Sequence, residues 1–349
     1  MISLKKFIID KSQEIGIDIC RFTDCNPLLN LKEYLNYRIE NNISTSFEEE
    51  DLRKRIDPKY TLSSCKSIIV LAMSYNVDLE ENAKYRLKGK LSRSSWGIDY
   101  HKVLSSKIEI LIEKMKSQVD FDYKYFVDTG PLIDRELAKK SGIGYYGKNC
   151  SIINDDYGSF VFIAYILTDL DIEKDDMVEE KCGDCDLCLR ACPTGALESK
   201  YRLNPKKCIS YLTQTKDDIP SELREKMGSK IYGCDTCQDV CPKNKDVIKS
   251  TVEDFIPLVS RGYLSIEEML TISNRQFKRK YGHMAGSWRG KKVLKRNAII
   301  ALGNMGDMKN LPLLIEQLKD QDRMIVSYVE WAIVNIYLIN LSKKKIIML

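Results

Sequence analysis

Cys182-Gly-Asp-Cys185-Asp-Leu-Cys188-Leu-Arg-Ala-Cys192-Pro193 is the stretch that decides how this chain is built, and a shorter run, Cys234-Asp-Thr-Cys237-Gln-Asp-Val-Cys241-Pro242, follows it. Cysteines spaced by two, two and three residues and followed by proline form the ligand pattern of 4Fe–4S clusters. In two-cluster proteins the fourth cysteine of such a run serves the other cluster. We therefore expect a first cluster held by Cys182, Cys185, Cys188 and Cys241. The second cluster is expected on Cys192, Cys208, Cys234 and Cys237.

Cys208 is included because the second run is one cysteine short and this is the only other thiol nearby in the sequence. The alternative is a pair of structural zinc sites, which two Cys-x2-Cys pairs can also form. Zinc does not account for the tight spacing of the first run or for the prolines. The pattern therefore favours a ferredoxin-like module with two 4Fe–4S clusters, and a protein that transfers electrons.

The composition is that of a soluble protein with room for two or three domains, at 349 residues with 44% hydrophobic and 30% charged. No apolar run reaches the roughly 18 residues that a membrane span needs. The first residues, MISLKKFIIDKSQEIG, become charged too early for a secretory signal, so we expect a cytoplasmic protein. Cysteines in a reducing compartment rarely form disulfides. The four cysteines outside the clusters are then expected to be small buried hydrophobes: Cys20, Cys25, Cys65 and Cys150.

Positive charge is concentrated in one segment. Residues 275–296 contain nine Lys or Arg and no acidic residue, whereas the whole chain has a net charge of only +5. The rest of the chain is therefore mildly acidic. A cationic segment on such a body predicts one surface that faces a polyanion, although a solvated helical face is the ordinary alternative.

The order of patterns predicts an α+β fold in three parts. Residues 1–170 are expected to be a mixed α/β domain with strands at 67–73, 123–127 and 160–167 and a helix over 103–115. Residues 171–250 hold the cluster module. Residues 251–349 are expected to be helical.

The helical part contains a possible internal repeat. The segments beginning at Arg296 and Tyr328 match at an offset of 31 residues, so that Ala301 pairs with Ala332 and Asn304 with Asn335. A second helix over 311–318 lies between them. This pattern is typical of a short HEAT-like repeat, and an ordinary helical bundle is the alternative.

Three further features are candidate functional sites. The segment from Gly142 to Asn149 matches Gly-x-Gly-x-x-Gly and, through Lys148, nearly matches a phosphate-binding Gly-x4-Gly-Lys-[Ser/Thr] loop. It lacks the preceding strand and following helix that both motifs require, so we reject nucleotide binding. Its glycines are expected to let the backbone approach something flat or bulky. Asp134 follows a Gly-Pro turn and could simply cap a helix. His101, in Asp99-x-His101-x-x-Leu104, lacks the glycine of the cobalt-ligating Asp-x-His-x-x-Gly motif.

Together these segments resemble the epoxyqueuosine reductases over most of the chain. The resemblance is carried by the cysteine pattern and by Arg55-Ile-Asp57-Pro58, Trp96-Gly97-Ile-Asp99-Tyr100-His101, Gly142 to Asn149, Gly158-Ser159 and His283-Met-Ala-Gly286-Ser287-Trp288-Arg289-Gly290-Lys291. Members of this family carry two 4Fe–4S clusters, depend on cobalamin without histidine ligation, and reduce epoxyqueuosine at the tRNA wobble position to queuosine.

The resemblance implies a role for several residues. The first 170 residues become the cobalamin-binding catalytic domain, in which the glycine-rich segment is a wall against the corrin and Asp134 is the proton donor. Four further positions match sites expected near the corrin: Asp57, Gly97, Gly158 and Thr215. Three cations of the basic segment are expected to contact tRNA: Arg289, Lys291 and Lys292. An external low-potential electron donor and a monomeric state complete these expectations.

Three other functions compete with this one. A cobalamin-dependent reductive dehalogenase would leave the basic segment and the repeat without a purpose. A ferredoxin-type electron carrier would contain clusters but no corrinoid. An RNA-binding scaffold with structural metals would contain no iron.

Overall fold

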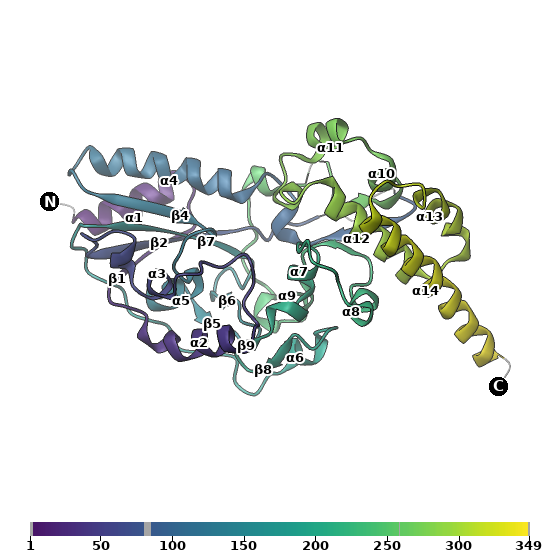
Figure 1. The fold of residues 1–349 in the computed structure, drawn as a ribbon. Helices are drawn as coiled ribbons and strands as arrows, with labels where there is room; N and C mark the ends of the chain where they lie inside the picture. Colours follow the sequence, from purple (N-terminus) through teal and green to yellow (C-terminus); the bar gives the residue numbers. More distant parts are fainter. Residues whose placement is uncertain (1–2, 80–84, 258, 348–349) are drawn as a thin grey trace.

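The structure is a computed structural model that describes residues 3–79, 85–257 and 259–347. Its two ends lie at opposite sides of the molecule (Figure 1). The longer helices of the N-terminal part are α1 (Leu4–Glu14), α2 (Lys32–Glu40), α3 (Leu52–Ile56), α4 (Tyr100–Lys116) and α5 (Asp134–Lys140). The C-terminal part contains α10 (Ile266–Thr271), α11 (Asn274–Tyr281), α12 (Lys291–Met305), α13 (Leu311–Gln317) and α14 (Arg323–Ile347).

The N-terminal part is built on a four-stranded antiparallel sheet with the order β1-β2-β7-β4. These strands are β1 (Ile19–Asp24), β2 (Ser67–Ser74), β7 (Val161–Thr168) and β4 (Tyr123–Val127). Every residue of β2 is buried. Side chains of a strand alternate between the two faces of its sheet. Accordingly, Ile69, Leu71 and Met73 join the core beneath α1 and α4, and Ile68, Val70 and Ala72 join the core with α2, α3 and α5.

The sequence predictions for this part are confirmed. The three predicted strands correspond to β2, β4 and β7, and the predicted helix lies within α4. The buried residues of α4 are the six whose spacing indicated a helix: Val103, Leu104, Ile108, Leu111, Ile112 and Met115. An apolar stripe of this period covers one side of a helix, so α4 is held by the sheet beneath it.

The cysteine region consists of short elements. Its helices are α6 (Leu187–Ala191), α7 (Ile209–Leu212), α8 (Ser221–Lys226) and α9 (Thr236–Asp239), and its strands are β8 (Leu197–Ser199), β9 (Arg202–Leu203) and β10 (Lys230–Tyr232). Cys188 lies on α6 and Cys237 on α9, two helices that pack together. Its buried apolar residues, among them Ile209, Ile219 and Ile231, belong to the core that it shares with the rest of the chain.

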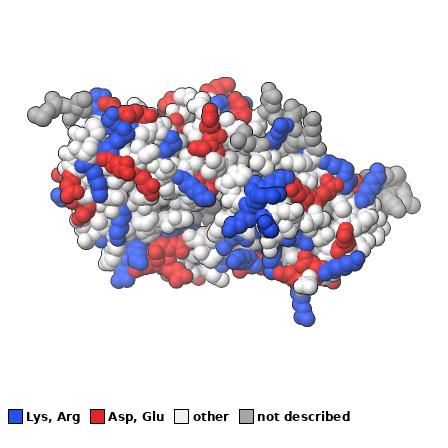
Figure 2. All heavy atoms as spheres, turned by 90° about the horizontal axis from the view of Figure 1, so that it is seen from above, with Lys and Arg blue, Asp and Glu red and all other residues white. Residues whose placement is uncertain are grey.

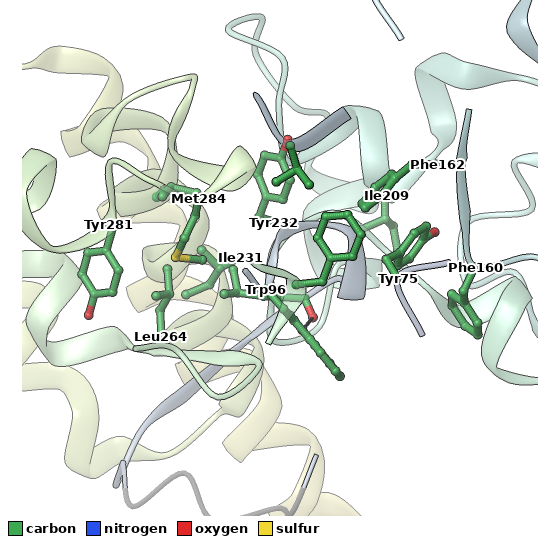
Figure 3. Close-up of a cluster of buried hydrophobic side chains, with 14 of the residues drawn as sticks. Tyr75, Trp96, Phe160, Phe162, Ile209, Ile231, Tyr232, Leu264, Tyr281 and Met284 are labelled. Atoms are coloured by element: carbon green, nitrogen blue, oxygen red, sulfur yellow. Dashed lines mark hydrogen bonds between the residues drawn. The ribbon is translucent and has the colours of Figure 1, made fainter. Parts of the chain in front are cut away.

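One small sheet joins the three parts of the chain. Strand β3 (Lys88–Leu91), from the N-terminal part, pairs in parallel with β10 and antiparallel with β11 (Tyr263–Ser265). Figure 3 shows the core beside it, where Phe162, Tyr232 and Met284 come from the three parts. The predicted division at residues 170 and 250 stays a prediction, and the apolar core is continuous across both positions.

Helices α12 and α14 run side by side in the same direction, and α13 connects them. Contacts follow one another in the same order along both helices: Arg296 with Tyr328, Gly303 with Ala332, and Gly306 with Ile339. Helices α12 and α14 pack so closely that a side chain on Gly303 would lie only 2.9 Å from the Cα of Ala332. Asn335 Nδ2 donates to the Gly303 carbonyl at 3.3 Å. The predicted second helix is α13. These contacts join the two segments that match in sequence, while the assignment to HEAT-like repeats stays a prediction.

One segment of α14 corrects the expectation about membrane spans. Within the described ranges, Arg323–Lys343 is long and apolar enough to cross a membrane by length and composition alone. However, Tyr328, Val329 and Ala332 on this helix are fully buried in the protein core. A single stretch of this kind is weak evidence for a span, because core helices pass the same test.

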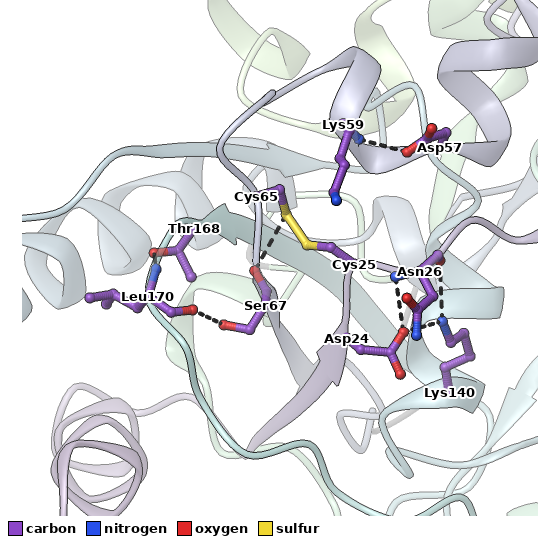
Figure 4. The surroundings of a disulfide bond; sticks show 10 residues. All are labelled: Asp24, Cys25, Asn26, Asp57, Lys59, Cys65, Ser67, Lys140, Thr168 and Leu170. Carbon is purple, nitrogen blue, oxygen red and sulfur yellow. Dashed lines mark hydrogen bonds and ion pairs between the residues drawn. A yellow bond between two sulfur atoms is a disulfide. The ribbon is translucent and has the colours of Figure 1, made fainter.

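A second correction concerns the cysteines outside the clusters. Cys25 and Cys65 are buried as expected, but a disulfide joins them across 40 residues of sequence (Figure 4). The bond links the end of β1 to the turn before β2. Cys20 is buried and Cys150 is half-buried, each with a free thiol. The sequence does not indicate the pairing, because only the fold brings these two positions together.

Candidate active site and cluster-binding cysteines

The first set of cysteines surrounds a small cavity. Cys182, Cys185, Cys188 and Cys241 line it together, and its volume is about 30 Å³. Burial raises the pKa of Cys182 to about 11, and the nearby Cys241 thiol acts in the same direction. Burial also raises the pKa of Cys188, and Cys241 and Cys185 act in the same direction. The structure therefore gathers the four thiols that the sequence assigned to the first cluster.

The second set lines a much larger cavity. Cys192, Cys208, Cys234 and Cys237 all lie on the wall of a cavity of about 1300 Å³. Burial raises the pKa of Cys208 to about 11, with Cys234 and Cys192 contributing to the rise. Burial also raises the pKa of Cys237, with Cys208 and Cys234 contributing. These four thiols are also neighbours, as expected for the second cluster.

The spacing within the two sets can be compared with that of a zinc site. A single zinc ion needs four donors at about 2.0–2.3 Å from one point. Among the described residues, no three His, Cys, Asp or Glu side chains are grouped so that they could hold a metal ion. A cluster with four irons is larger than a single ion, so its four thiolates need not meet at one point.

The large cavity lies where the N-terminal part meets the cysteine module. Its wall includes Tyr34 and Arg38 from α2, Tyr145 and Tyr146 from β5 (Tyr145–Tyr146), and Trp288 near the start of α12. Several buried polar atoms around it have no hydrogen-bond partner within the described part of the chain: Arg38 Nε, His101 Nε2, Tyr145 Oη, Asn149 Nδ2 and Arg289 Nε. Buried polar atoms without partners are costly, so these atoms indicate that the cavity receives a polar ligand.

Asp134 lies directly behind the wall of this cavity. Its sequence neighbours Ile133 and Arg135 line the cavity, whereas Asp134 itself does not. The helix-capping alternative is wrong, because Ile133 is the N-cap of α5 and the Asp134 Oδ1 atom is buried without a hydrogen bond. Burial raises the pKa of Asp134 well above its ordinary value, and the Asp128 carboxylate adds to the effect. Both effects favour the protonated form of the Asp134 carboxyl.

A second group of ionisable side chains lines the same cavity. Asp99, Tyr100, His101 and Asp128 are all on its wall. The Asp99 Oδ1 atom lies 2.7 Å from His101 Nδ1, and Asp128 Oδ2 lies 3.7 Å from His101 Nε2. The Tyr100 hydroxyl donates to Asp128 Oδ2 at 2.7 Å. Both ring nitrogens of His101 therefore face carboxylates, which agrees with its rejection as a cobalt ligand.

The glycine-rich segment forms part of the wall, but its glycines serve the protein's own packing. Asn149 and Cys150 line the cavity. A side chain on Gly142 would lie 2.1 Å from the Asp176 carbonyl oxygen, and one on Gly144 would lie 2.4 Å from that of Ile153. These two glycines therefore allow a close approach to neighbouring backbone within the chain, and the approach to a flat or bulky group stays a prediction.

Lys148 has a role that the sequence analysis missed. This buried side chain donates to the carbonyl oxygens of Gly183 and, at 2.9 Å, of Cys185. It thus ties the glycine-rich segment to the loop that presents the first cysteine set. The only sequence signal is the place of this lysine after Gly147, where it nearly completes a phosphate-binding loop pattern.

The other predicted cobalamin contacts are not on the cavity wall. Asp57 accepts a hydrogen bond from the Lys59 backbone at 2.9 Å and so caps a short helical turn. Gly97 packs against the backbone at 254–255, and Gly158 packs against Asn244. The buried Thr215 hydroxyl donates to Asp217 at 2.8 Å. The fold thus uses these four positions locally, and their cofactor contacts stay predictions.

The basic segment is less cationic in the structure than in the sequence. Lys292 pairs with Asp322 and Lys295 with Asp320, two acids outside the segment. Arg296 is fully buried, and its guanidinium donates to the backbone carbonyls of Leu212 and Thr215 at 2.7–2.8 Å. Lys291 donates to the Ile272 carbonyl. The prediction of one unopposed cationic surface over 275–296 is therefore corrected.

Exposed cations remain on α11. Arg275, Lys278 and Arg279 of this helix are exposed, and Lys280 is exposed but pairs with Glu268. Figure 2, which views the face that carries α11 and α4, shows Lys and Arg gathered near the middle of the molecule. Of the three predicted RNA contacts, only Arg289 lies on the cavity wall.

Arg289 belongs to an aromatic cluster at the cavity that the sequence did not reveal. Its guanidinium lies 3.9 Å from the ring centre of Trp288 and 4.6 Å from that of Phe47. Trp288 and Phe47 are both exposed, and both line the cavity. Aromatic rings and a guanidinium plane are typical surfaces for an unstacked nucleobase.

Comparisons with known proteins agree with this geometry. A family model described as "4Fe-4S double cluster binding domain" matches residues 181–244, which include all eight cysteines of the two sets. A second, described as "Epoxyqueuosine reductase QueG, DUF1730", matches residues 55–129. The epoxyqueuosine reductase of Bacillus anthracis is 43% identical over 340 residues, which cover 95% of this chain and 88% of that protein.

Solved structures are equally similar. An epoxyqueuosine reductase crystallised with a tRNA-Tyr epoxyqueuosine-modified stem loop has 42% identity and a TM-score of 0.92, covering 95% of this chain and 90% of that one. A Bacillus subtilis epoxyqueuosine reductase, described with "the Asp134 catalytic loop swung out of the active site", has 40% identity, a TM-score of 0.90 and the same coverage. With these relatives and this cysteine-lined cavity, the chain belongs to the epoxyqueuosine reductase family.

Proposed function

We propose that this chain reduces epoxyqueuosine to queuosine in tRNA, the last step of queuosine biosynthesis, within the large cavity. Membership of the family carries the reaction, and the chain contains a 4Fe–4S double cluster binding domain. One observation supports this location. The second cysteine set lies on the cavity wall, and the buried Asp134 carboxyl, whose Oδ1 atom has no hydrogen-bond partner in the described chain, lies just behind that wall. Electron transfer and proton transfer can thus meet at one place.

The residues around the cavity fit cobalamin. The volume of about 1300 Å³ suits a large ligand, and unpartnered polar atoms such as Tyr145 Oη and Asn149 Nδ2 could bind amide groups at its periphery. His101 is held by carboxylates, which supports binding without a histidine ligand. When bound, the cofactor supplies the low-valent metal chemistry of the reduction. Asp57, Gly97, Gly158 and Thr215 remain candidate contacts for its outer parts.

The two cysteine sets would hold the clusters at different depths. The second set would place its cluster in the cavity wall, and the first set would place its cluster outside the cavity. Cys188 of the first set influences the pKa of Cys237 of the second, so the two sets are neighbours. Electrons from an external low-potential donor can therefore enter at the first set and leave towards the cavity.

Asp134 would supply a proton. Its raised pKa favours the neutral carboxyl, the form that a general acid requires. A small movement of the segment between Gly130 and α5 would bring it through the wall. The Bacillus subtilis relative is described with an Asp134 catalytic loop that swings out of its active site, which supports such a movement here.

The tRNA would reach the cavity at the aromatic cluster. Phe47, Trp288 and Arg289 could hold the anticodon bases, and the exposed cations of α11 could contact phosphates. Lys291 and Lys292 would contribute less, because both already have partners in the protein. We further expect a monomer in the cytoplasm, where its tRNA substrate is found.

The test is reduction of a defined substrate. Anaerobically prepared protein, loaded with iron, sulfide and cobalamin, is incubated with epoxyqueuosine-modified stem loop and a low-potential reductant. Nucleoside analysis by mass spectrometry should show queuosine, and omission of cobalamin should abolish it. Unchanged product formation without cobalamin would contradict the proposed use of the cavity.

A further inference from the structure

Trp288 has a fixed orientation where the wall of the large cavity meets solvent. Its indole Nε1 donates to Gln214 Oε1 at 3.0 Å and to the Tyr232 hydroxyl at 3.1 Å. Tyr232 in turn donates to Gln214 Oε1 at 3.0 Å, so the three side chains form a closed triangle on the cavity wall. Trp288 is nevertheless 53% exposed, and the N–H of an exposed indole can bond to water. The two protein acceptors therefore serve to fix the plane of the ring.

The backbone that presents Gln214 and Tyr232 is itself held in place. Arg296 and Asn297, two fully buried residues of α12, donate to backbone carbonyls on both sides of Gln214. These carbonyls lie 2.7–2.8 Å from their donors and belong to Leu212, Thr213 and Thr215. Asn297 also donates, at 2.7 Å, to the carbonyl of Ile231, the residue before Tyr232. Both acceptors of the indole N–H are thus presented by backbone that buried hydrogen bonds fix.

We propose that Gln214 and Tyr232 are positioning residues that hold the Trp288 indole as a fixed platform, on which one unpaired base of the RNA substrate stacks. Aromatic side chains are the usual stacking surfaces for unpaired bases, because every base has a flat face. A ring that is already fixed in the free protein loses less conformational freedom when the base arrives. The inference rests on the proposed function and adds to it the residues that prepare the ring.

The neighbours of Trp288 suit a nucleotide. The Arg289 guanidinium lies 3.9 Å from the indole ring centre and places a positive charge beside it. Arg289 Nε is buried and has no hydrogen-bond partner in the part of the chain that the structure describes, so a donor is available to a ligand here. The ring centres of Phe47 and Trp288 are 5.7 Å apart at an angle of 69°, so the two rings are not stacked on one another. A nucleotide offers the flat face, the acceptors and the negative charge that complement this arrangement.

Binding of RNA to the holoenzyme tests the assignment without turnover. The probes are an unmodified RNA stem loop, which has unpaired bases, and a fully paired RNA duplex of the same length. Gln214→Met and Tyr232→Phe should each weaken stem-loop binding by about three- to tenfold, because the ring must then be ordered on binding. Duplex binding should not change. Gln118→Met, at an exposed glutamine, is the matched control and should bind both RNAs as the wild type does.

A double-mutant cycle shows whether Gln214 acts through Trp288. Trp288→Phe keeps an aromatic ring but removes the indole N–H, so Gln214→Met should weaken binding little further in that background. With the modified stem loop and fully loaded enzyme, the loss from Gln214→Met should appear in KM rather than in kcat. Iron and cobalamin contents equal to those of the wild type show that the variants are folded.

Two results would overturn the inference. One is wild-type affinity for the stem loop in both Gln214→Met and Tyr232→Phe. The other is a loss from Gln214→Met that is as large for the duplex, or as large in the Trp288→Phe background, because the glutamine would then act independently of the ring. A chain that shows the expected binding pattern but forms no queuosine would instead refute the proposed function and leave the platform standing.

Discussion

The two cysteine sets have the same ligand chemistry but different surroundings. Cys182, Cys185, Cys188 and Cys241 enclose a cavity of about 30 Å³, whereas Cys192, Cys208, Cys234 and Cys237 open onto one of about 1300 Å³. One set lines only the small cavity, while the other forms part of the wall of the cavity proposed as the site of reduction. Position in the fold therefore gives two similar cysteine sets different surroundings.

The largest expected effect comes from substitutions within the sets. Cys182→Ser and Cys237→Ser should each lose roughly half of the bound iron and nearly all turnover, because each removes one thiolate of a four-cysteine cluster. Only Cys237→Ser should also weaken cobalamin binding, since Cys237 lines the large cavity. Iron analysis and cobalamin titration by absorbance distinguish the two. Equal cobalamin affinity in both variants would show that the two cysteine sets do not differ in their contact with cobalamin.

Asp134→Asn tests the acid behind the cavity wall. We expect turnover to fall by roughly 10²- to 10⁴-fold, the usual contribution of a general acid, with iron and cobalamin contents unchanged. Single-turnover conversion of the modified stem loop measures the effect. Asp171→Asn, at an exposed position in the linker, is the matched control. Comparable rates for both variants would show that Asp134 is not the proton donor.

The basic segment offers a similar contrast, because Arg289 lies on the cavity wall whereas Lys292 pairs with Asp322. Arg289→Ala should weaken stem-loop binding by about tenfold and reduce its salt dependence, because Arg289 lies at the aromatic cluster. Lys292→Ala should have a smaller effect, since Asp322 already pairs with Lys292. Fluorescence anisotropy at several salt concentrations measures both. A larger loss for Lys292→Ala would reverse the assignment.

The smallest effect is expected at Lys148. Lys148→Met removes two contacts to the loop of the first set but leaves the large cavity intact. Chelators should then extract iron from the first cluster a few-fold faster, while initial turnover stays near wild type. Lys200→Met, at an exposed position, is the control. Identical iron release in the two variants would mean that Lys148 does not support this loop.

Much of this molecule could be predicted from local patterns. The buried strand β2 and the six buried residues of α4 follow from periodicity, which depends only on neighbouring residues. The division of the cysteines into two sets followed from their spacing, including the isolated Cys208. In each case the property that fixes the structure is contained in a short segment.

Contacts between distant segments could not be predicted. Lys148 reaches carbonyls 35 and 37 residues away, and Cys25 pairs with Cys65 across 40 residues. The cations of residues 275–296 looked unopposed because Asp320 and Asp322, which neutralise two of them, lie outside that segment. Phe47 and Trp288 meet only after the N-terminal and C-terminal parts have packed together.

The most direct test of the account compares product formation by the wild type with product formation by Asp134→Asn. Fully loaded wild-type protein should convert epoxyqueuosine in the stem loop to a nucleoside lighter by one oxygen atom, as measured by mass spectrometry. Asp134→Asn, with both clusters and cobalamin bound, should leave nearly all of the epoxide intact over the same period. If the loaded wild type leaves the epoxide unchanged, or the variant converts it at the same rate, the assignment of the large cavity as the site of reduction is wrong.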